Sequence, residues 1–150
     1  MCSIKKLQEL AAEQIVRGRV VLYPVASLKP HEHHFVERLD LVRKHVIKKG
    51  KWTKPIVVDA STGIVADGHH RRQLGIADEL TYIPAVLINY QDSEDVVVYK
   101  GHGSEATDEI IDPQEIIDTV LAGELMPKKY TRHQFSFEIP DVSIDISRLK

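Results

Sequence analysis

Two periods of apolar residues alternate along this chain, and this alternation constrains the fold more than any other feature of the sequence. Apolar residues three and four apart predict a helix, as in the stripe Phe35, Leu39, Val42 and Val46. Short runs rich in β-branched residues, bounded by proline, glycine or aspartate, predict strands. These runs are Val20–Tyr23, Pro55–Asp59, Ile64–Ala66, Ile83–Tyr90 and Val96–Tyr99. Helices interspersed among strands predict an α+β fold with a mixed sheet in a single compact domain.

The length of 150 residues agrees with one domain, because typical domains have about 100–200 residues. We expect an N-terminal helix at about 4–17, a core at about 20–92, and a C-terminal helix with a closing segment at about 93–150. The apolar runs are far shorter than the roughly 20 residues of a membrane helix, and the start shows no apolar signal-peptide segment. The single cysteine excludes an internal disulfide. A cytoplasmic protein without a membrane partner is expected.

The charge and the histidines point to different classes of partner. A formal net charge of −2 at pH 7 disfavours nucleic acid, because neutralising its phosphates usually requires a strong basic excess. The chain has eight histidines, and five of them fall in two clusters, His31/His33/His34 and His69/His70. Histidine is a frequent acid, base and metal ligand near neutral pH, so these clusters are where we look for a site.

Glycine, proline and aspartate mark where several elements begin and end. Gly50 predicts the end of the helix that contains Val46, and Ala60–Gly63 predicts a hairpin turn. Asp112-Pro113-Gln114-Glu115 predicts a helix start, with an N-cap acceptor and proline at N1, and that helix is expected to run to about Ala122. Alternating residues at 134–139 and 142–146 predict two strands near the C-terminus.

The strongest chemical signal is the segment Ile64–Arg72, in which an apolar strand passes through Gly68 into a helix. The free N–H groups and the macrodipole of a helix N-terminus attract anions. The side chains of His69-His70-Arg71 add donors there, and arginine binds phosphate bidentately. Asp67 supplies a carboxylate for a metal ion bound to the same phosphates. A phosphate site is one interpretation of this corner, and a solvated strand-to-helix turn is the other.

A second signal is the segment His31-Glu32-His33-His34, which follows Pro30. Glu32 is a candidate general base, a candidate metal ligand, or part of a hydrated loop. With His69 and His70 these histidines allow a transition-metal site as an alternative, although the usual HExxH and CxxC spacings of zinc sites are absent.

Two further segments carry polar side chains suited to phosphate. Thr131-Arg132-His133 offers hydroxyl, guanidinium and imidazole donors, and a solvated basic turn is the alternative interpretation. Thr53 and Lys54 contribute to the same site only if they face the turn at Gly68.

These segments together resemble the ParB/sulfiredoxin superfamily over about residues 20–135. The resemblance lies in Leu28–Glu32, Trp52–Val58, Asp67–Arg71 with the helix that follows, and Thr131–His133. Within the superfamily the chain is most similar to the free serine kinases, which phosphorylate L-serine to O-phospho-L-serine. Sulfiredoxins have a reactive cysteine where this chain has His69, and chromosome-partitioning ParB proteins have a Gly-Glu-Arg-Arg type of box. Both of these branches match less well.

The resemblance implies a small-molecule kinase that transfers a phosphoryl group from ADP or ATP to free L-serine or a similar hydroxyl metabolite. Glu32 and His70 would be catalytic, with Glu32 acting on the acceptor hydroxyl, and Asp67 would help to hold Mg²⁺. The acceptor would contact His31, Glu32 and His102. The nucleotide and its phosphates would be bound by Thr53, Lys54, Gly68, His69, His70, Arg71, Thr131, Arg132 and His133.

The chain departs from the family pattern after the strand Val96–Tyr99. Relatives have a tryptophan-containing stretch there that helps to hold the amino acid, whereas this chain reads Lys100-Gly101-His102-Gly103-Ser104. The acceptor is therefore open between serine and other small alcohols, and the donor is open between ADP and ATP. A non-enzymatic nucleotide-binding regulatory module and a histidine-metal enzyme are the alternative functions. The sequence sets no oligomeric state.

Overall fold

The computed structural model describes residues 19–32 and 38–150. The helix expected at about 4–17 lies outside the described residues, as do His33 and His34. The helices are α2 Leu39–Val46, α3 His69–Ala77 and α4 Pro113–Leu121, with short 3-10 turns η1 Val25–Ser27, η2 Gly103–Glu105 and η3 Ile146–Arg148. The strands are β1 Val20–Pro24, β2 Ile47–Lys48, β3 Lys51–Trp52, β4 Ile56–Asp59, β5 Val65–Asp67, β6 Tyr82–Ile88, β7 Val96–Lys100, β8 Ile110–Ile111, β9 Thr131–Phe135 and β10 Ile144–Asp145.

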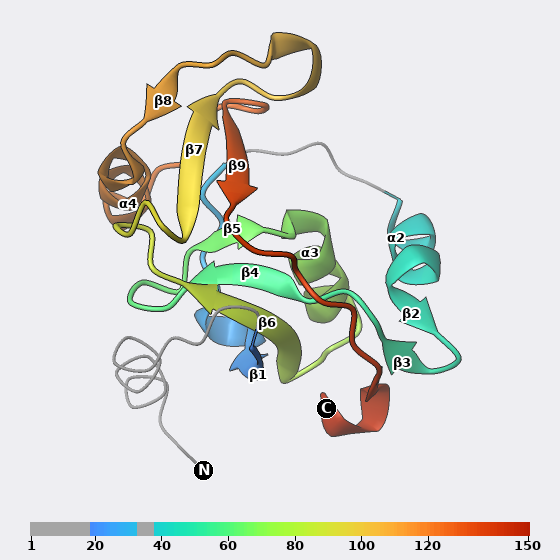
Figure 1. Ribbon diagram of the computed structural model, residues 1–150. Coiled ribbons are helices and arrows are strands. Elements are labelled where there is room, and N and C mark those ends of the chain that lie inside the picture. The colour runs from blue at the N-terminus through green and yellow to red at the C-terminus, as the bar shows by residue number, and fades with distance from the viewer. Residues whose placement is uncertain (1–18, 33–37) are drawn as a thin grey trace.

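The central sheet has four strands in the order β1-β6-β4-β5 (Figure 1). Strand β6 pairs antiparallel with β1 and parallel with β4, and β4 pairs antiparallel with β5. Strand β4 is buried along its whole length. Because side chains alternate across a strand, Ile56 and Val58 enter one hydrophobic core and Val57 enters another. The central sheet therefore separates two cores, and the expected α+β fold with a mixed sheet is confirmed.

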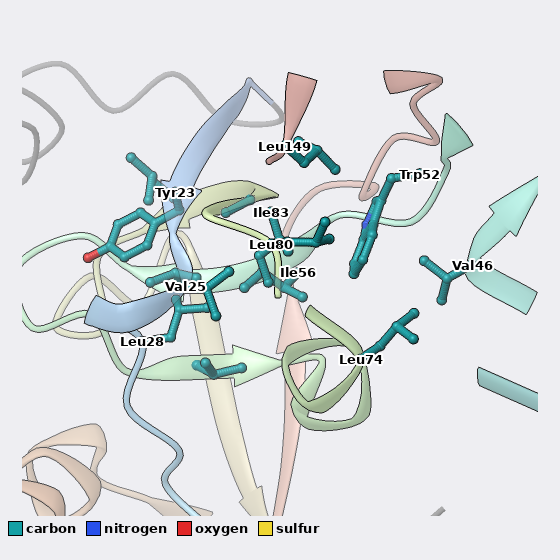
Figure 2. Packing of buried hydrophobic residues seen from close by; sticks show 14 of the residues in the cluster. Tyr23, Val25, Leu28, Val46, Trp52, Ile56, Leu74, Leu80, Ile83 and Leu149 are labelled. Atoms are coloured by element: carbon teal, nitrogen blue, oxygen red, sulfur yellow. The ribbon is translucent and has the colours of Figure 1, made fainter. Parts of the chain in front are cut away.

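The first core packs helix α3 and the C-terminal turn against the central sheet. Figure 2 shows Trp52, Leu74 and Leu149 converging with side chains of the sheet such as Ile56, and all four residues are fully buried. The indole nitrogen of Trp52 donates a hydrogen bond of 2.6 Å to the backbone carbonyl of Lys54, which satisfies the one polar atom of this large side chain. The end of the chain thus closes this core.

The second core lies between the central sheet, helix α4 and a three-stranded sheet in the order β8-β7-β9. Helix α4 begins as expected, because the side chain of Asp112 accepts a hydrogen bond of 2.9 Å from the backbone N–H of Gln114 and proline follows at N1. Strand β9 pairs antiparallel with β7. Figure 1 shows β9 descending from this outer sheet toward β5, and the site forms where the two sheets meet.

The expected end of helix α2 at Gly50 is wrong. The helix ends at Val46, whose carbonyl accepts hydrogen bonds from both the backbone N–H and the hydroxyl of Thr53, at 2.9 and 2.6 Å. Strands β2 and β3 follow as a hairpin in which Lys49 and Gly50 have φ of 52° and 75°. Two consecutive positive φ angles are characteristic of a type I′ turn, so Gly50 closes a hairpin.

The two expected C-terminal strands also differ from the structure. Strand β9 spans Thr131–Phe135 because it pairs with β7 along its length, from Lys100↔Thr131 to Val96↔Phe135. The segment interpreted as a basic turn is therefore largely a strand. Strand β10 has only two residues, Ile144 and Asp145, which pair with β3. Within residues 19–32 and 38–150, no helix is both long and apolar enough to cross a membrane.

Candidate functional site

A cavity of about 590 Å³ opens where three segments of the chain meet. The first segment precedes α2, the second is the corner between β5 and α3, and the third runs into β9. The residues that line the cavity are His31, Glu32, Ala66, Asp67, Gly68, His69, His70, Arg71, His102, Lys128, Lys129, Thr131, Arg132, His133 and Phe135.

The corner between β5 and α3 depends on Gly68. This residue has φ of 110°, a conformation that side chains rarely allow, and a Cβ placed there would lie 2.5 Å from Cγ2 of Ile56. Gly68 is also the N-cap of α3 and offers no side-chain acceptor, so no N-cap side chain occupies the first N–H groups of this helix. The positive end of α3 therefore faces the cavity.

Arg71 braces this corner with two hydrogen bonds. Its guanidinium donates to the backbone carbonyl of Pro55 at 2.7 Å and to the Asp67 carboxylate at 3.1 Å. The contact with Pro55 anchors the arginine beside the start of β4. Asp67 keeps about half of its side chain exposed while it pairs with Arg71, so a carboxylate oxygen is accessible from the cavity.

Glu32 is joined to β9 by hydrogen bonds to one of its oxygens. Oε2 accepts from the backbone N–H of Thr131 at 3.1 Å and from its hydroxyl at 2.5 Å, and lies 3.6 Å from Nε2 of His31. The backbone supports this contact, because Glu32 forms a bridge with Met126 and the N–H of Met126 donates to the carbonyl of His31. Burial alone would raise the pKa of Glu32, but contacts with His31 and Thr131 lower it below 4.5. The site therefore holds an ionised carboxylate.

His31 is 2% exposed, and both of its ring nitrogens have partners. Nδ1 lies 2.6 Å from the backbone carbonyl of Val65, and Nε2 lies 3.0 Å from the hydroxyl of Thr131. Its backbone N–H donates to Nε2 of His69 at 3.2 Å. The ring therefore ties the first segment to both β5 and β9.

Strand β9 presents Thr131 and His133 on one face and Arg132 on the other, as the two-residue period of a strand requires. The Arg132 guanidinium lies 4.6 Å from the centroid of the Tyr99 ring and donates to the carbonyl of Thr107. Nε2 of His133 lies 2.8 Å from the hydroxyl of Tyr90. Burial, and secondarily His31, hold the pKa of His133 well below 6.5.

Acidification is expected to destabilise the fold through His133. Because its pKa is lower in the folded chain than in the unfolded chain, unfolding takes up a proton as the pH falls below 6.5, and the free energy of unfolding decreases. In urea unfolding between about pH 7 and pH 5, the change in the free energy of unfolding should be more negative for the unmodified protein than for His133→Gln, because the other titrating groups are common to both. The carboxylate of Glu32 does not obscure this window, because its stabilising effect is lost only below 4.5.

The matched control for this titration is His45→Gln, which removes an exposed ring on α2. It should retain the pH dependence of the unmodified protein. An equal decrease in His133→Gln and the unmodified protein would show that another group causes the acid destabilisation.

The structure brings together at this cavity all but two of the described residues that the sequence singled out. Thr53 and Lys54 are the exceptions: Thr53 caps the end of α2, and the ammonium of Lys54 pairs with Asp141 at 2.7 Å. Sequence reasoning missed Tyr90, because its contact with His133 joins residues 43 positions apart. It also missed Phe135, although this residue lies on the cavity face two positions after His133 in a strand.

Comparisons with known proteins identify the fold. No family model matches the chain. A ParB-like protein from Sulfolobus acidocaldarius is 35% identical over 74 residues, which is 48% of this chain and 35% of the relative. Two solved structures cover 91% of this chain: a free serine kinase in complex with AMP (TM-score 0.74, 16% identity, 95% of that chain) and a conserved hypothetical protein from Pyrococcus furiosus (TM-score 0.72, 17% identity, 99% of that chain). The chain has the ParB/sulfiredoxin-like fold.

A third solved structure with the ParB/sulfiredoxin-like fold is also similar to this chain. SbnI from Staphylococcus aureus, truncated at its C-terminus, covers 87% of this chain with a TM-score of 0.68 and 16% identity. The similarity to the superfamily that the motifs indicated is thereby confirmed at the level of the fold. This chain spans about a third of the curated ParB-like relative.

The histidine-metal alternative gains no support from the part of the chain that the structure describes. Within these residues no three histidine, cysteine, aspartate or glutamate side chains are grouped so that they could hold a metal ion. His31 has both ring nitrogens engaged by Val65 and Thr131. A metal ion bound jointly by Asp67 and the phosphates of a ligand needs no such group, since Mg²⁺ commonly takes one or two carboxylates and completes its shell with phosphate and water.

Proposed function

We propose that this protein is a phosphotransferase that moves a phosphoryl group from a nucleotide, ADP or ATP, to the hydroxyl of a small metabolite such as free L-serine. The observation that carries the proposal is that an ionised, partly buried carboxylate and a helix N-terminus without a side-chain cap line one cavity. Neither feature alone suffices, because a helix terminus binds many anions and a buried glutamate is often structural.

The phosphate chain is assigned to the β5–α3 corner. The N–H groups at the start of α3 supply fixed donors, and Arg71, His69 and His70 surround them with further donors. Lys128, Lys129 and Arg132 line the same cavity, so the segment that leads into β9 adds positive charge to that of Arg71. Free serine kinase structures with this fold are in complex with AMP or ADP, which supports a nucleotide as the ligand.

Glu32 is assigned to the acceptor. The acceptor oxygen attacks the terminal phosphorus, the bond from phosphorus to the leaving nucleotide breaks, and Glu32 takes the hydroxyl proton. Phosphoryl transfer has a loose transition state, so positioning the attacking oxygen contributes more than strong basicity does. A carboxylate with a lowered pKa, held rigidly by β9, suits that task.

The remaining predicted roles follow from this placement. Asp67 would hold Mg²⁺ together with the phosphates, and bound Mg²⁺ neutralises the charge that develops on the transferred group. His102 lines the cavity and is assigned to the acceptor side, and His70 is retained as a catalytic residue beside the phosphates. Thr53 and Lys54 have structural partners elsewhere, and we assign them no part in nucleotide binding.

A donor-by-acceptor assay tests the function. The full chain, with Mg²⁺, would be given ADP, ATP or CTP, each with and without L-serine or homoserine, and phosphorus NMR would detect a new phosphomonoester. We expect product with at least one pair, which also identifies the donor. Nucleotide binding without product from any pair would contradict the kinase and favour the regulatory module, the alternative that the similarity to a ParB-like protein suggests.

A further inference from the structure

A chain of hydrogen bonds runs from the backbone of β5 to the carboxylate of Glu32. Nδ1 of His31 lies 2.6 Å from the carbonyl oxygen of Val65, and Nε2 lies 3.0 Å from the hydroxyl of Thr131. That hydroxyl lies 2.5 Å from Oε2 of Glu32. Three short contacts therefore follow one another through two ionisable side chains.

Each of these contacts requires one hydrogen, and the hydrogens can be counted. A carbonyl oxygen carries none, so Nδ1 of His31 donates to Val65. The hydroxyl of Thr131 has a single hydrogen, which serves only one of its two contacts. The remaining hydrogen must belong either to Nε2 of His31 or to Oε2 of Glu32.

The surroundings of Glu32 place this hydrogen on His31. Oε2 also accepts the backbone N–H of Thr131 at 3.1 Å, and two donors to one oxygen favour a carboxylate over a protonated acid. The contacts with His31 and Thr131 lower the pKa of Glu32 even though burial opposes this. With Glu32 as a carboxylate, the hydrogen count makes Nε2 of His31 the donor to Thr131 and Thr131 the donor to Glu32.

The neighbouring rings are consistent with one charge in this cluster. The ring centroid of His133 lies 5.1 Å from that of His31, and burial and His31 hold its pKa well below 6.5, so it is neutral. Burial raises the pKa of Tyr90 well above 10, so its hydroxyl keeps its proton and can donate to Nε2 of His133. The ring of His69, 4.6 Å from His31, accepts the backbone N–H of His31.

We propose that His31 is a positioning residue that, as an imidazolium, holds Glu32 through the Thr131 hydroxyl as a carboxylate with Oε2 engaged and Oε1 available to the acceptor. Within the described residues, both hydrogen bonds donated to Glu32 end on Oε2. His31 thus acts through Glu32, whereas the resemblance implied that it touches the acceptor. The catalytic part of this proposal rests on the proposed phosphotransferase function, and the charge of His31 does not.

The charge is tested by nitrogen-15 NMR of the ligand-free full chain near neutral pH. Histidine ring nitrogens would be observed in two-bond proton–nitrogen spectra, with His31 and His133 assigned from His31→Gln and His133→Gln. We expect both ring nitrogens of His31 to be protonated, and only one in His133. A neutral His31 in the unmodified protein would overturn the proposal, and the two variants serve only to assign the signals.

The link through Thr131 is tested with a matched pair of variants. Thr131→Ser keeps the hydroxyl and should keep the imidazolium signature, whereas Thr131→Val removes the hydroxyl and should convert His31 to a neutral ring. If the kinase assay succeeds, Thr131→Val should lower kcat about 10–100-fold with a smaller change in KM for the nucleotide, and Thr131→Ser should restore most of it. Thr131→Val with an imidazolium and unchanged kcat would overturn the positioning role.

The two proposals fail independently. No phosphomonoester in any assay, together with a doubly protonated His31, would remove the proposed function and leave the charge assignment standing. Phosphoryl transfer together with a neutral His31 would support the proposed function and overturn the charge assignment.

Discussion

Glu32→Gln is expected to reduce phosphoryl transfer about 10²–10⁴-fold while nucleotide affinity is retained. Glutamine keeps the size of the side chain and an oxygen that can accept hydrogen bonds from Thr131, but it cannot take the hydroxyl proton. The proposed phosphate donors lie on α3 and β9 and are unchanged. Phosphorus NMR would measure turnover, and calorimetry with ADP or ATP would measure binding.

The control for Glu32→Gln is Glu115→Gln, which removes one negative charge from the exposed face of α4. This variant should match the unmodified protein in both measurements. Full turnover in Glu32→Gln would show that the carboxylate is not the base. Loss of nucleotide binding in Glu32→Gln would instead assign Glu32 to the nucleotide.

Gly68→Ala is expected to lower the free energy of unfolding by about 2–6 kcal/mol, from backbone strain of about 1–3 kcal/mol and overpacking of similar size. The strain arises because Gly68 has φ of 110°. The overpacking arises because the new Cβ would lie 2.5 Å from Cγ2 of Ile56. Ile56 belongs to β4, and its side chain is fully buried in the first core. Urea unfolding of the full chain measures the change.

Gly123→Ala separates the two causes. Gly123 has φ of 82°, and a Cβ added there would meet no atom within 4 Å, so only the backbone cost of about 1–2 kcal/mol is expected. A larger loss in Gly68→Ala than in Gly123→Ala is expected, mainly from the collision with Ile56. Equal losses would show that β4 moves aside, and the rigid corner on which the proposed phosphate site depends would then be wrong.

The corner at Gly68 and the cap at Asp112 were predictable because their causes are local. A strand run, a glycine and the start of a helix lie within nine residues at 64–72, and the Asp112 cap acts on the residue two positions later. Gly50 misled the prediction because one glycine serves equally well to end a helix or to close a type I′ hairpin. The contacts of Thr53 decide between these two roles, because its N–H and hydroxyl both donate to the last carbonyl of α2 and end the helix before Gly50.

The sequence by itself determined the class of fold, the strand-to-helix corner at Gly68 and most of the residues that line the cavity, because periodicity and backbone geometry act over a few positions. Only the tertiary structure decided which of these residues touch. Glu32 meets Thr131 across 99 positions and His31 meets it across 100, while Lys54 pairs with Asp141 away from the cavity. Pairing of β9 with β7 sets these contacts, and strand pairing depends on packing between distant segments that no local pattern contains.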